Sequence, residues 1–177
     1  MGQIRIIGGT LRGRKVTVSE AEGLRPTSDR VRETLFNWLN QDLTGKNCLD
    51  LFAGSGILGV EALSRGARRV DFVEKHPKIA KQIQKNVIAF GLLQGKVHQQ
   101  DAQEFLAGTQ ECYDIVFCDP PFFGGQIADW LMLIQPHLKK EAVVYLETEK
   151  DIILSEKWQT YRQLDTKQAC CRLLYLE

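Results

Sequence analysis

The chain has 177 residues, of which 44% are hydrophobic and 25% are charged, and this composition is typical of one soluble globular domain with a small appendage. No apolar run approaches the roughly 20 residues that a membrane span needs, and the first residues lack the apolar core of a signal peptide. The five cysteines include no C-x-x-C pair, which argues against a disulfide framework or a metal site. We therefore expect reduced thiols in a cytoplasmic protein.

The net charge of +1 is unevenly distributed along the chain. Residues 1–32 carry seven bases and three acids, whereas the remainder carries 16 bases and 19 acids. This excess of positive charge indicates an anionic partner at the N-terminal end. A basic, solvated surface without a partner is an equally good interpretation of charge alone.

The N-terminal part predicts a β-hairpin followed by a helix. Two short β-like runs, "QIRIIGG" and "RKVTV", are joined by a turn whose basic tip spans residues 12–15. A helix is expected from about Ser28 to Asn40, because Thr27 or Ser28 can cap it and Asp29 suits its positive end. Apolar residues then recur at helical spacing.

From Cys48 onward, expected strands alternate with expected helices, and this pattern predicts βαβ units. The strands are "CLDLF", "RVDFVE", "KVHQQ", "YDIVFCD" and "AVVYLE", and residues 157–177 are expected to add an antiparallel hairpin at one edge. The fold class is α/β, with a doubly wound, mostly parallel, Rossmann-like sheet of seven strands. We divide the chain into a basic hairpin-and-helix extension, residues 1–45, and a main domain, residues 46–177.

Four of these strands are followed by an acidic residue, namely Asp50, Glu74, Asp101 and Asp119. In a parallel sheet, ligands bind beyond the carboxyl ends of the strands, near the point where the strand order reverses. Four acids at consecutive strand ends therefore indicate a ligand site at that edge of the sheet.

A glycine loop, "FAGSGILG", follows the first of these acids and contains G-x-G-x-x-G at Gly54, Gly56 and Gly59. Gly54 and Gly56 let the backbone turn sharply and approach a ligand, and Gly59 lets the following helix pack tightly on the sheet. Glu74 ends the next strand, where a carboxylate can accept hydrogen bonds from both hydroxyls of a ribose. Because NAD and S-adenosylmethionine both carry such a ribose, the loop and Glu74 leave these two cofactors open.

The segment "DPPF", from Asp119 to Phe122, separates the two cofactors by chemistry. An exocyclic amine of a base is a poor nucleophile, because its lone pair is delocalised into the ring. The Asp119 carboxylate and the Pro120 carbonyl can accept hydrogen bonds from the two N–H groups of the amine. They can also stabilise the positive charge that develops as the methyl group arrives. The two prolines make the loop rigid, and Phe122 can stack on the base. The segment therefore predicts methylation of an amine, although alone it is often only a turn at the end of a strand.

These motifs resemble those of class I S-adenosylmethionine-dependent methyltransferases, through "LDLFAGSGILG", "FVEK", "QDA" and "DPPF". The stretches "IRIIGGTLRGRKV" and "GLRPTSDRVRETLFNWL" closely resemble the RsmD-type enzymes, which methylate the N2 amine of one guanine in bacterial small-subunit (16S) ribosomal RNA. The resemblance runs from about Gln3 to the C-terminus and is dense up to Phe122. It implies S-adenosylmethionine as cofactor, no metal, and a monomer that acts on 16S ribosomal RNA within a particle containing ribosomal proteins.

The resemblance assigns roles to individual residues. It implies that Glu74 holds the ribose, that Asp101 accepts from the adenine amine, and that residues 25–27 close over the methionine end of the cofactor. A plain helix cap is the alternative role of Asp101. The full set of expected cofactor residues is Arg25, Thr27, Asp50, Phe52, Ala53, Gly54, Ser55, Gly56, Glu74, Lys75, Asp101, Ala102 and Asp119.

For the acceptor, the resemblance implies that Asp119 and Pro120 orient the guanine amine and that Phe122 stacks on the base. A base that reaches Asp119 must leave its stack, which favours a single-stranded or loop target. The residues expected to bind RNA phosphates are Arg5, Arg12, Arg14, Lys15 and Arg30.

Three alternatives stay open at this point. An amino-methyltransferase acting on DNA adenine N6 or on a protein glutamine amide would more often carry N-P-P-[YF]. A nicotinamide oxidoreductase would use the glycine loop but leave "DPPF" without a role. An RNA-binding module without catalysis would bind RNA but no cofactor.

Overall fold

The computed structural model describes residues 1–20, 27–121, 127–149 and 152–177. Arg25 and Phe122, for which the sequence predicts roles in cofactor binding and base stacking, lie outside these residues.

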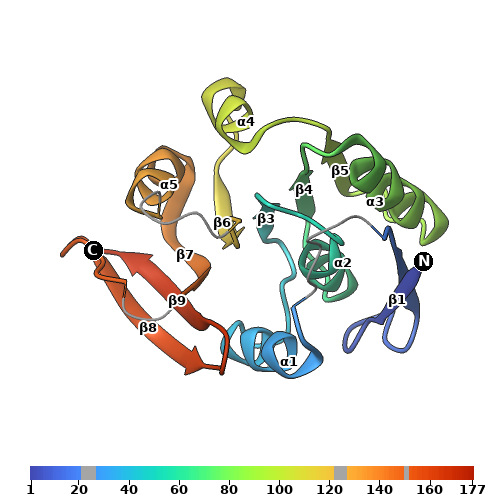
Figure 1. The fold of residues 1–177 in the computed structure, drawn as a ribbon, viewed down its shortest axis with the longest axis horizontal. Helices are drawn as coiled ribbons and strands as arrows, with labels where there is room; N and C mark the ends of the chain where they lie inside the picture. The colour runs from blue at the N-terminus through green and yellow to red at the C-terminus, as the bar shows by residue number, and fades with distance from the viewer. Residues whose placement is uncertain (21–26, 122–126, 150–151) are drawn as a thin grey trace.

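A seven-stranded sheet forms the centre of the molecule, in the order β5-β4-β3-β6-β7-β9-β8 (Figure 1). The strands are β3 (Asn47–Asp50), β4 (Arg69–Val73), β5 (Gly95–His98), β6 (Tyr113–Cys118), β7 (Leu138–Thr148), β8 (Trp158–Asp165) and β9 (Cys170–Leu176). Strands β3 to β7 pair in parallel, and β9 runs antiparallel between β7 and β8. The predicted mostly parallel, doubly wound sheet of seven strands is thus confirmed.

Helices cover both faces of the sheet, as Figure 1 shows. Helices α1 (Asp29–Trp38), α2 (Ile57–Ser64) and α3 (Pro77–Ala89) share one hydrophobic core with the sheet, and α4 (Ala102–Gly108) and α5 (Ile127–Ile134) share the other. A short 3₁₀ turn, Gln135–His137, leads from α5 into β7. Among the described residues, no helix combines the length and apolarity needed to cross a membrane.

Several element boundaries differ from the sequence expectation, and for two of them the backbone shows the reason. Helix α1 starts as predicted, because the Ser28 hydroxyl accepts from the Val31 N–H at 3.3 Å, but it ends at Trp38. Asn40 has a φ of 62°, a left-handed conformation that cannot continue a helix. Strand β7 begins four residues before the apolar run at Ala142, since a bulge at Glu141, with φ of 64°, lets it keep pairing with β6.

The predicted N-terminal hairpin is present as β1 (Gly2–Arg5) and β2 (Lys15–Val18). It lies beside α2 and α3 (Figure 1), where the Asn86 amide accepts from the Thr17 N–H at 3.3 Å and donates to the Thr17 carbonyl at 2.8 Å. Ile6 and Val16 are fully buried in the core that contains α1 to α3. The proposed division after residue 45 therefore separates two segments that share one core.

A buried ion network fastens the hairpin to helices α1 and α2. Arg32 of α1 donates from Nη1 to Glu61 of α2 at 2.7 Å and to the Arg5 carbonyl at 3.0 Å. Glu61 also accepts from the Ile7 N–H at 2.8 Å and forms an ion pair with Arg65. Because Arg32 and Glu61 are fully buried, this network fixes three elements relative to one another.

Candidate active site

The glycine loop joins β3 to α2 at the edge where the parallel strands end. Gly54 and Gly56 have φ values of 53° and 76°, in the left-handed region that favours glycine. A Cβ atom on Gly59 would lie 2.2 Å from the ring of Phe72 on β4. The expected close packing of the helix on the sheet is therefore confirmed.

Glu74, after β4, lies against this loop. Its Oε2 accepts from the Gly54 N–H at 3.0 Å, and its Oε1 accepts from the His76 N–H at 2.9 Å. Two backbone donors thus hold the carboxylate beside the glycine turn, where the sequence predicts a ribose ligand. Lys75, which follows, is exposed.

Asp50 is buried beneath the loop, and its Oδ2 accepts from the Gly59 N–H at 3.1 Å. Burial raises the pKa of Asp50 to about 8; the Gly59 hydrogen bond lowers it, and the negative charges of Asp119 and Glu74 raise it. Three acids that the sequence places at separate strand ends therefore interact electrostatically at one edge.

The other predicted cofactor residues make local contacts. Asp101 caps α4 by accepting from the Gln103 N–H at 2.8 Å, as its alternative role requires, and Ala102 is buried. Ser55 accepts from the Ile57 N–H at 3.3 Å. The Phe52 ring packs edge-on against Trp130 of α5, with 4.9 Å between ring centroids.

Asp119, after β6, lines a cavity of about 310 Å³ that we call the Asp119 pocket. Its walls come from the start of α1, from the ends of β6 and β7, and from the β8–β9 hairpin; they consist of Thr27, Ser28, Val31, Asp119, Glu147, Glu149, Thr166, Gln168, Ala169 and Cys171. Burial raises the pKa of Asp119 to about 7, and the negative charge of Glu147 contributes. Pro120 is buried beside it.

Glu147 is an acidic residue of this pocket that the sequence analysis did not predict. It lies near the end of β7, beside Asp119, because β6 and β7 pair in parallel with Cys118 opposite Leu146. A signal was available in the sequence, since Glu147 ends the run "AVVYLE" in the way that Asp50, Glu74 and Asp119 follow their own strands.

The five predicted RNA-binding residues differ in their surroundings. Arg5 and Lys15, the strand pair next to the hairpin turn, line a hollow of about 410 Å³ that shares Thr27 and Ser28 with the Asp119 pocket. Arg14 instead packs over the ring of Phe90, with 4.4 Å between its guanidinium carbon and the ring centroid. Arg12 and Arg30 are exposed.

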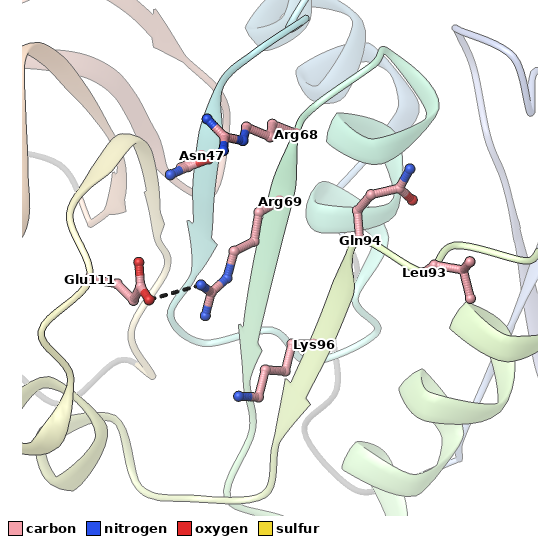
Figure 2. Close-up of a pocket in the computed structure, with 7 residues that line it drawn as sticks. All are labelled: Asn47, Arg68, Arg69, Leu93, Gln94, Lys96 and Glu111. Atoms are coloured by element: carbon pink, nitrogen blue, oxygen red, sulfur yellow. Dashed lines mark ion pairs between the residues drawn. The ribbon is translucent and has the colours of Figure 1, made fainter.

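A further hollow, of about 430 Å³, lies at the opposite end of the strands (Figure 2). Figure 2 shows Arg69 of β4 in an ion pair with Glu111 at 2.9 Å, and Lys96 on the neighbouring strand β5. The lining of this hollow includes none of the predicted cofactor, acceptor or RNA residues. The candidate active site is therefore the edge with the glycine loop and the Asp119 pocket.

Comparison with known proteins gives consistent results. A family model described as conserved hypothetical protein 95 matches residues 4–175. Ribosomal RNA small subunit methyltransferase D of Escherichia coli K12 is 42% identical over 99% of this chain and 91% of its own length. The Haemophilus influenzae protein of the same name is 43% identical over 97% of this chain and 93% of its own length. A solved Escherichia coli structure, titled as the candidate methyltransferase yhhF, superposes with a TM-score of 0.90 at 42% identity and covers 99% of both chains.

Proposed function

The chain belongs to the family described as conserved hypothetical protein 95, together with the small-subunit ribosomal RNA methyltransferases D, and on this premise we propose that it methylates the N2 amine of a guanine in 16S ribosomal RNA with S-adenosylmethionine. The names of the relatives support methylation of ribosomal RNA. The observation that supports transfer to an amine is Asp119, which lies in a pocket beside the glycine-loop edge and whose pKa, about 7, suits a proton acceptor. The choice of guanine N2 follows from the resemblance of the N-terminal stretches to the RsmD-type enzymes.

The cofactor proposal is supported by the charges at this edge. Asp50, Glu74 and Asp119 interact there, and their mutual repulsion contributes to the raised pKa of Asp50. A ligand with a positive sulfonium relieves this repulsion, whereas the pyrophosphate of a dinucleotide adds negative charge. The Glu74 carboxylate beside the Gly54 turn suits the ribose of S-adenosylmethionine.

When bound, S-adenosylmethionine supplies the methyl group: a carbon–nitrogen bond forms at N2, the carbon–sulfur bond breaks, sulfur keeps the electron pair, and N2 gives up a proton. Asp119 orients the amine by accepting a hydrogen bond from its N–H group. The Asp119 carboxylate also stabilises the positive charge that develops on N2. Asp119 also accepts the released proton, for which a pKa of about 7 is well matched. The Pro120 carbonyl serves as the second acceptor for the amine.

The RNA reaches this pocket past the hollow that Arg5 and Lys15 line. The hollow with Arg5 and Lys15 adjoins the Asp119 pocket through Thr27 and Ser28. A base flipped into the pocket thus leaves its flanking phosphates near two positive charges. We retain the further expectations of a cytoplasmic monomer that acts on a small-subunit particle with ribosomal proteins.

Replacing Asp119 tests the proposal. We expect Asp119→Ala to slow methyl transfer at least about 100-fold, because orientation of the amine and proton acceptance are both lost. Binding of S-adenosylmethionine, measured by calorimetry, should survive, because the glycine loop and Glu74 remain in place. The matched control is Asp129→Ala, at an exposed position on α5.

Two readouts decide the outcome. Mass spectrometry of 16S ribosomal RNA, from cells with and without the gene, should show the loss of one N2-methylguanine. An Asp119→Ala protein with full activity would remove Asp119 from the mechanism. Binding of NAD without any signal for S-adenosylmethionine would overturn the proposed function itself.

A further inference from the structure

We propose that Glu147 selects guanine, by accepting a hydrogen bond from N1–H of the base while Asp119 accepts from the N2 amine. This inference rests on the proposed function and deepens it, because it names the residue that decides which base enters the Asp119 pocket. Asp119 alone binds an exocyclic amine, and adenine and cytosine also carry one.

The strand register places the two carboxylates side by side. Strands β6 and β7 are parallel neighbours in which Cys118 pairs with Leu146, so Asp119 and Glu147 follow at the same level. Neighbouring strands are about 4.8 Å apart, and both residues line the same cavity. The two carboxylates on neighbouring strands can therefore accept hydrogen bonds from two adjacent donors on one edge of a base.

The Glu147 carboxylate is held in place from beneath the pocket. The fully buried Tyr145 donates from its hydroxyl to Glu147 Oε2 at 3.0 Å. On the other side of the strand, Glu147 pairs with Cys171 of β9, which also lines the pocket. A carboxylate restrained in this way retains its position without the ligand, as a selective site requires.

The hydrogen-bonding pattern of the bases gives Glu147 its effect. Guanine presents two neighbouring donors, N1–H and the N2 amine, and an ionised carboxylate is purely an acceptor. Adenine presents an acceptor, its N1 lone pair, next to its amine, and cytosine likewise presents N3. In either base a ring-nitrogen lone pair would face the Glu147 carboxylate with no hydrogen between the two acceptors. Burying two acceptors against each other is strongly disfavoured.

An analogue of guanine separates the role of Glu147 from that of Asp119. 2-Aminopurine has the reactive 2-amine but carries a lone pair at N1 instead of a hydrogen. The experiment uses 16S ribosomal RNA with 2-aminopurine or guanine at the position that mass spectrometry identifies, assembled with small-subunit proteins. Methyl transfer to each RNA is compared for the unaltered protein, Glu147→Gln, and the exposed control Glu156→Gln.

We expect the unaltered protein and Glu156→Gln to prefer guanine. The side-chain amide introduced by Glu147→Gln can donate to the N1 lone pair of 2-aminopurine. This variant should therefore reduce the preference for guanine over 2-aminopurine about 10- to 100-fold. An unchanged preference in an active Glu147→Gln protein would overturn the inference while leaving the proposed function standing. If the unaltered protein fails to methylate guanine N2, the proposed function fails instead.

A second variant keeps the test decisive if Glu147→Gln does not fold. Tyr145→Phe removes the hydroxyl that holds Glu147 and leaves the ring in the core. We expect its preference for guanine over 2-aminopurine to fall several-fold, with binding of S-adenosylmethionine unchanged. Equal preference in Tyr145→Phe and the unaltered protein would count against Glu147 as the selecting residue.

Discussion

Asp119 lies beside a second carboxylate, and this neighbour contributes to its affinity for a proton. The pKa of Asp119 rises to about 7 through burial and through the charge of Glu147, and Asp50 lies close enough for Asp119 to raise its pKa in turn. The ionised form of Asp119 is the one that can accept from the amine. The activity should therefore fall as the pH drops through about 7.

We predict a rising limb in the pH dependence of kcat/KM for S-adenosylmethionine, which reports the protein without cofactor, with a midpoint near pH 7. In Glu147→Gln the negative neighbour is gone, so the pKa of Asp119 falls and the midpoint moves to lower pH. Methyl-transfer rates between pH 5 and 9, with RNA binding measured at each pH, give both midpoints. The assignment fails if the unaltered midpoint lies below pH 5, or if removing Glu147 leaves it in place.

At the scale of single residues, the sequence predicted that Asp50, Glu74 and Asp119 meet, and the structure brings them to one edge. The meeting could be predicted because each lies at or just after the end of an apolar strand, and carboxyl ends of parallel strands meet at one edge. The sequence could not predict that the β8–β9 hairpin contributes to the Asp119 pocket through Thr166, Gln168 and Cys171. This contribution depends on where the hairpin joins the sheet, and the periodicity of a strand does not indicate which strand it pairs with.

At the scale of elements, helices α1 and α2 are joined to the hairpin through charges rather than through apolar contacts alone. Arg32 and Glu61 are both fully buried, and Glu61 accepts from Arg32, from Arg65 and from the Ile7 N–H. Removing one partner of such a network leaves its other charges uncompensated inside the protein.

We predict that Glu61→Gln lowers the free energy of unfolding by about 3–5 kcal/mol, as is typical when a buried ion pair loses one partner. Urea denaturation followed by circular dichroism measures this change. The control Glu33→Gln, exposed on α1, should shift stability by no more than about 0.5 kcal/mol. A loss below about 1 kcal/mol in Glu61→Gln would mean that the network contributes little.

Element boundaries show what sequence patterns leave out. The start of α1 could be predicted from Ser28, whose hydroxyl caps it, but its end depends on the left-handed conformation of Asn40. The bulge at Glu141 extends β7 beyond its apolar run. The irregularity in β7 comes from its pairing with β6, which a local pattern does not encode, whereas the end of α1 is set by local backbone bonds such as the one from the Gln41 N–H to the Phe36 carbonyl.

At the scale of the whole molecule, a basic hollow beside the hairpin adjoins the Asp119 pocket, whereas a second basic hollow lies at the far end of the sheet. Arg5 and Lys15 line the first, and Arg68, Arg69 and Lys96 line the second (Figure 2). The two hollows have similar volumes and are both positively charged, so each serves as a comparison for the other.

We predict that Arg5→Ala with Lys15→Ala weakens RNA binding and lowers the slope of log K against log salt by about 1 to 2, because up to two phosphate contacts are lost. Fluorescence anisotropy between 50 and 200 mM salt measures the slope. The control Arg68→Ala with Lys96→Ala should leave it unchanged. Equal effects of the two pairs would show that RNA binding follows general charge and not the hollow lined by Arg5 and Lys15.

The position of β9 between β7 and β8 has a consequence for the order in which the protein becomes competent. The glycine loop, Glu74 and Asp119 all precede residue 120, yet the wall of the Asp119 pocket includes Ala169 and Cys171. A nascent chain that has emerged only through β7 would hold Asp119 and Glu147 beside an unfinished cavity. We therefore expect this pocket to be complete only once residues 170–176 pair with β7, when nearly the whole chain has left the ribosome that makes it.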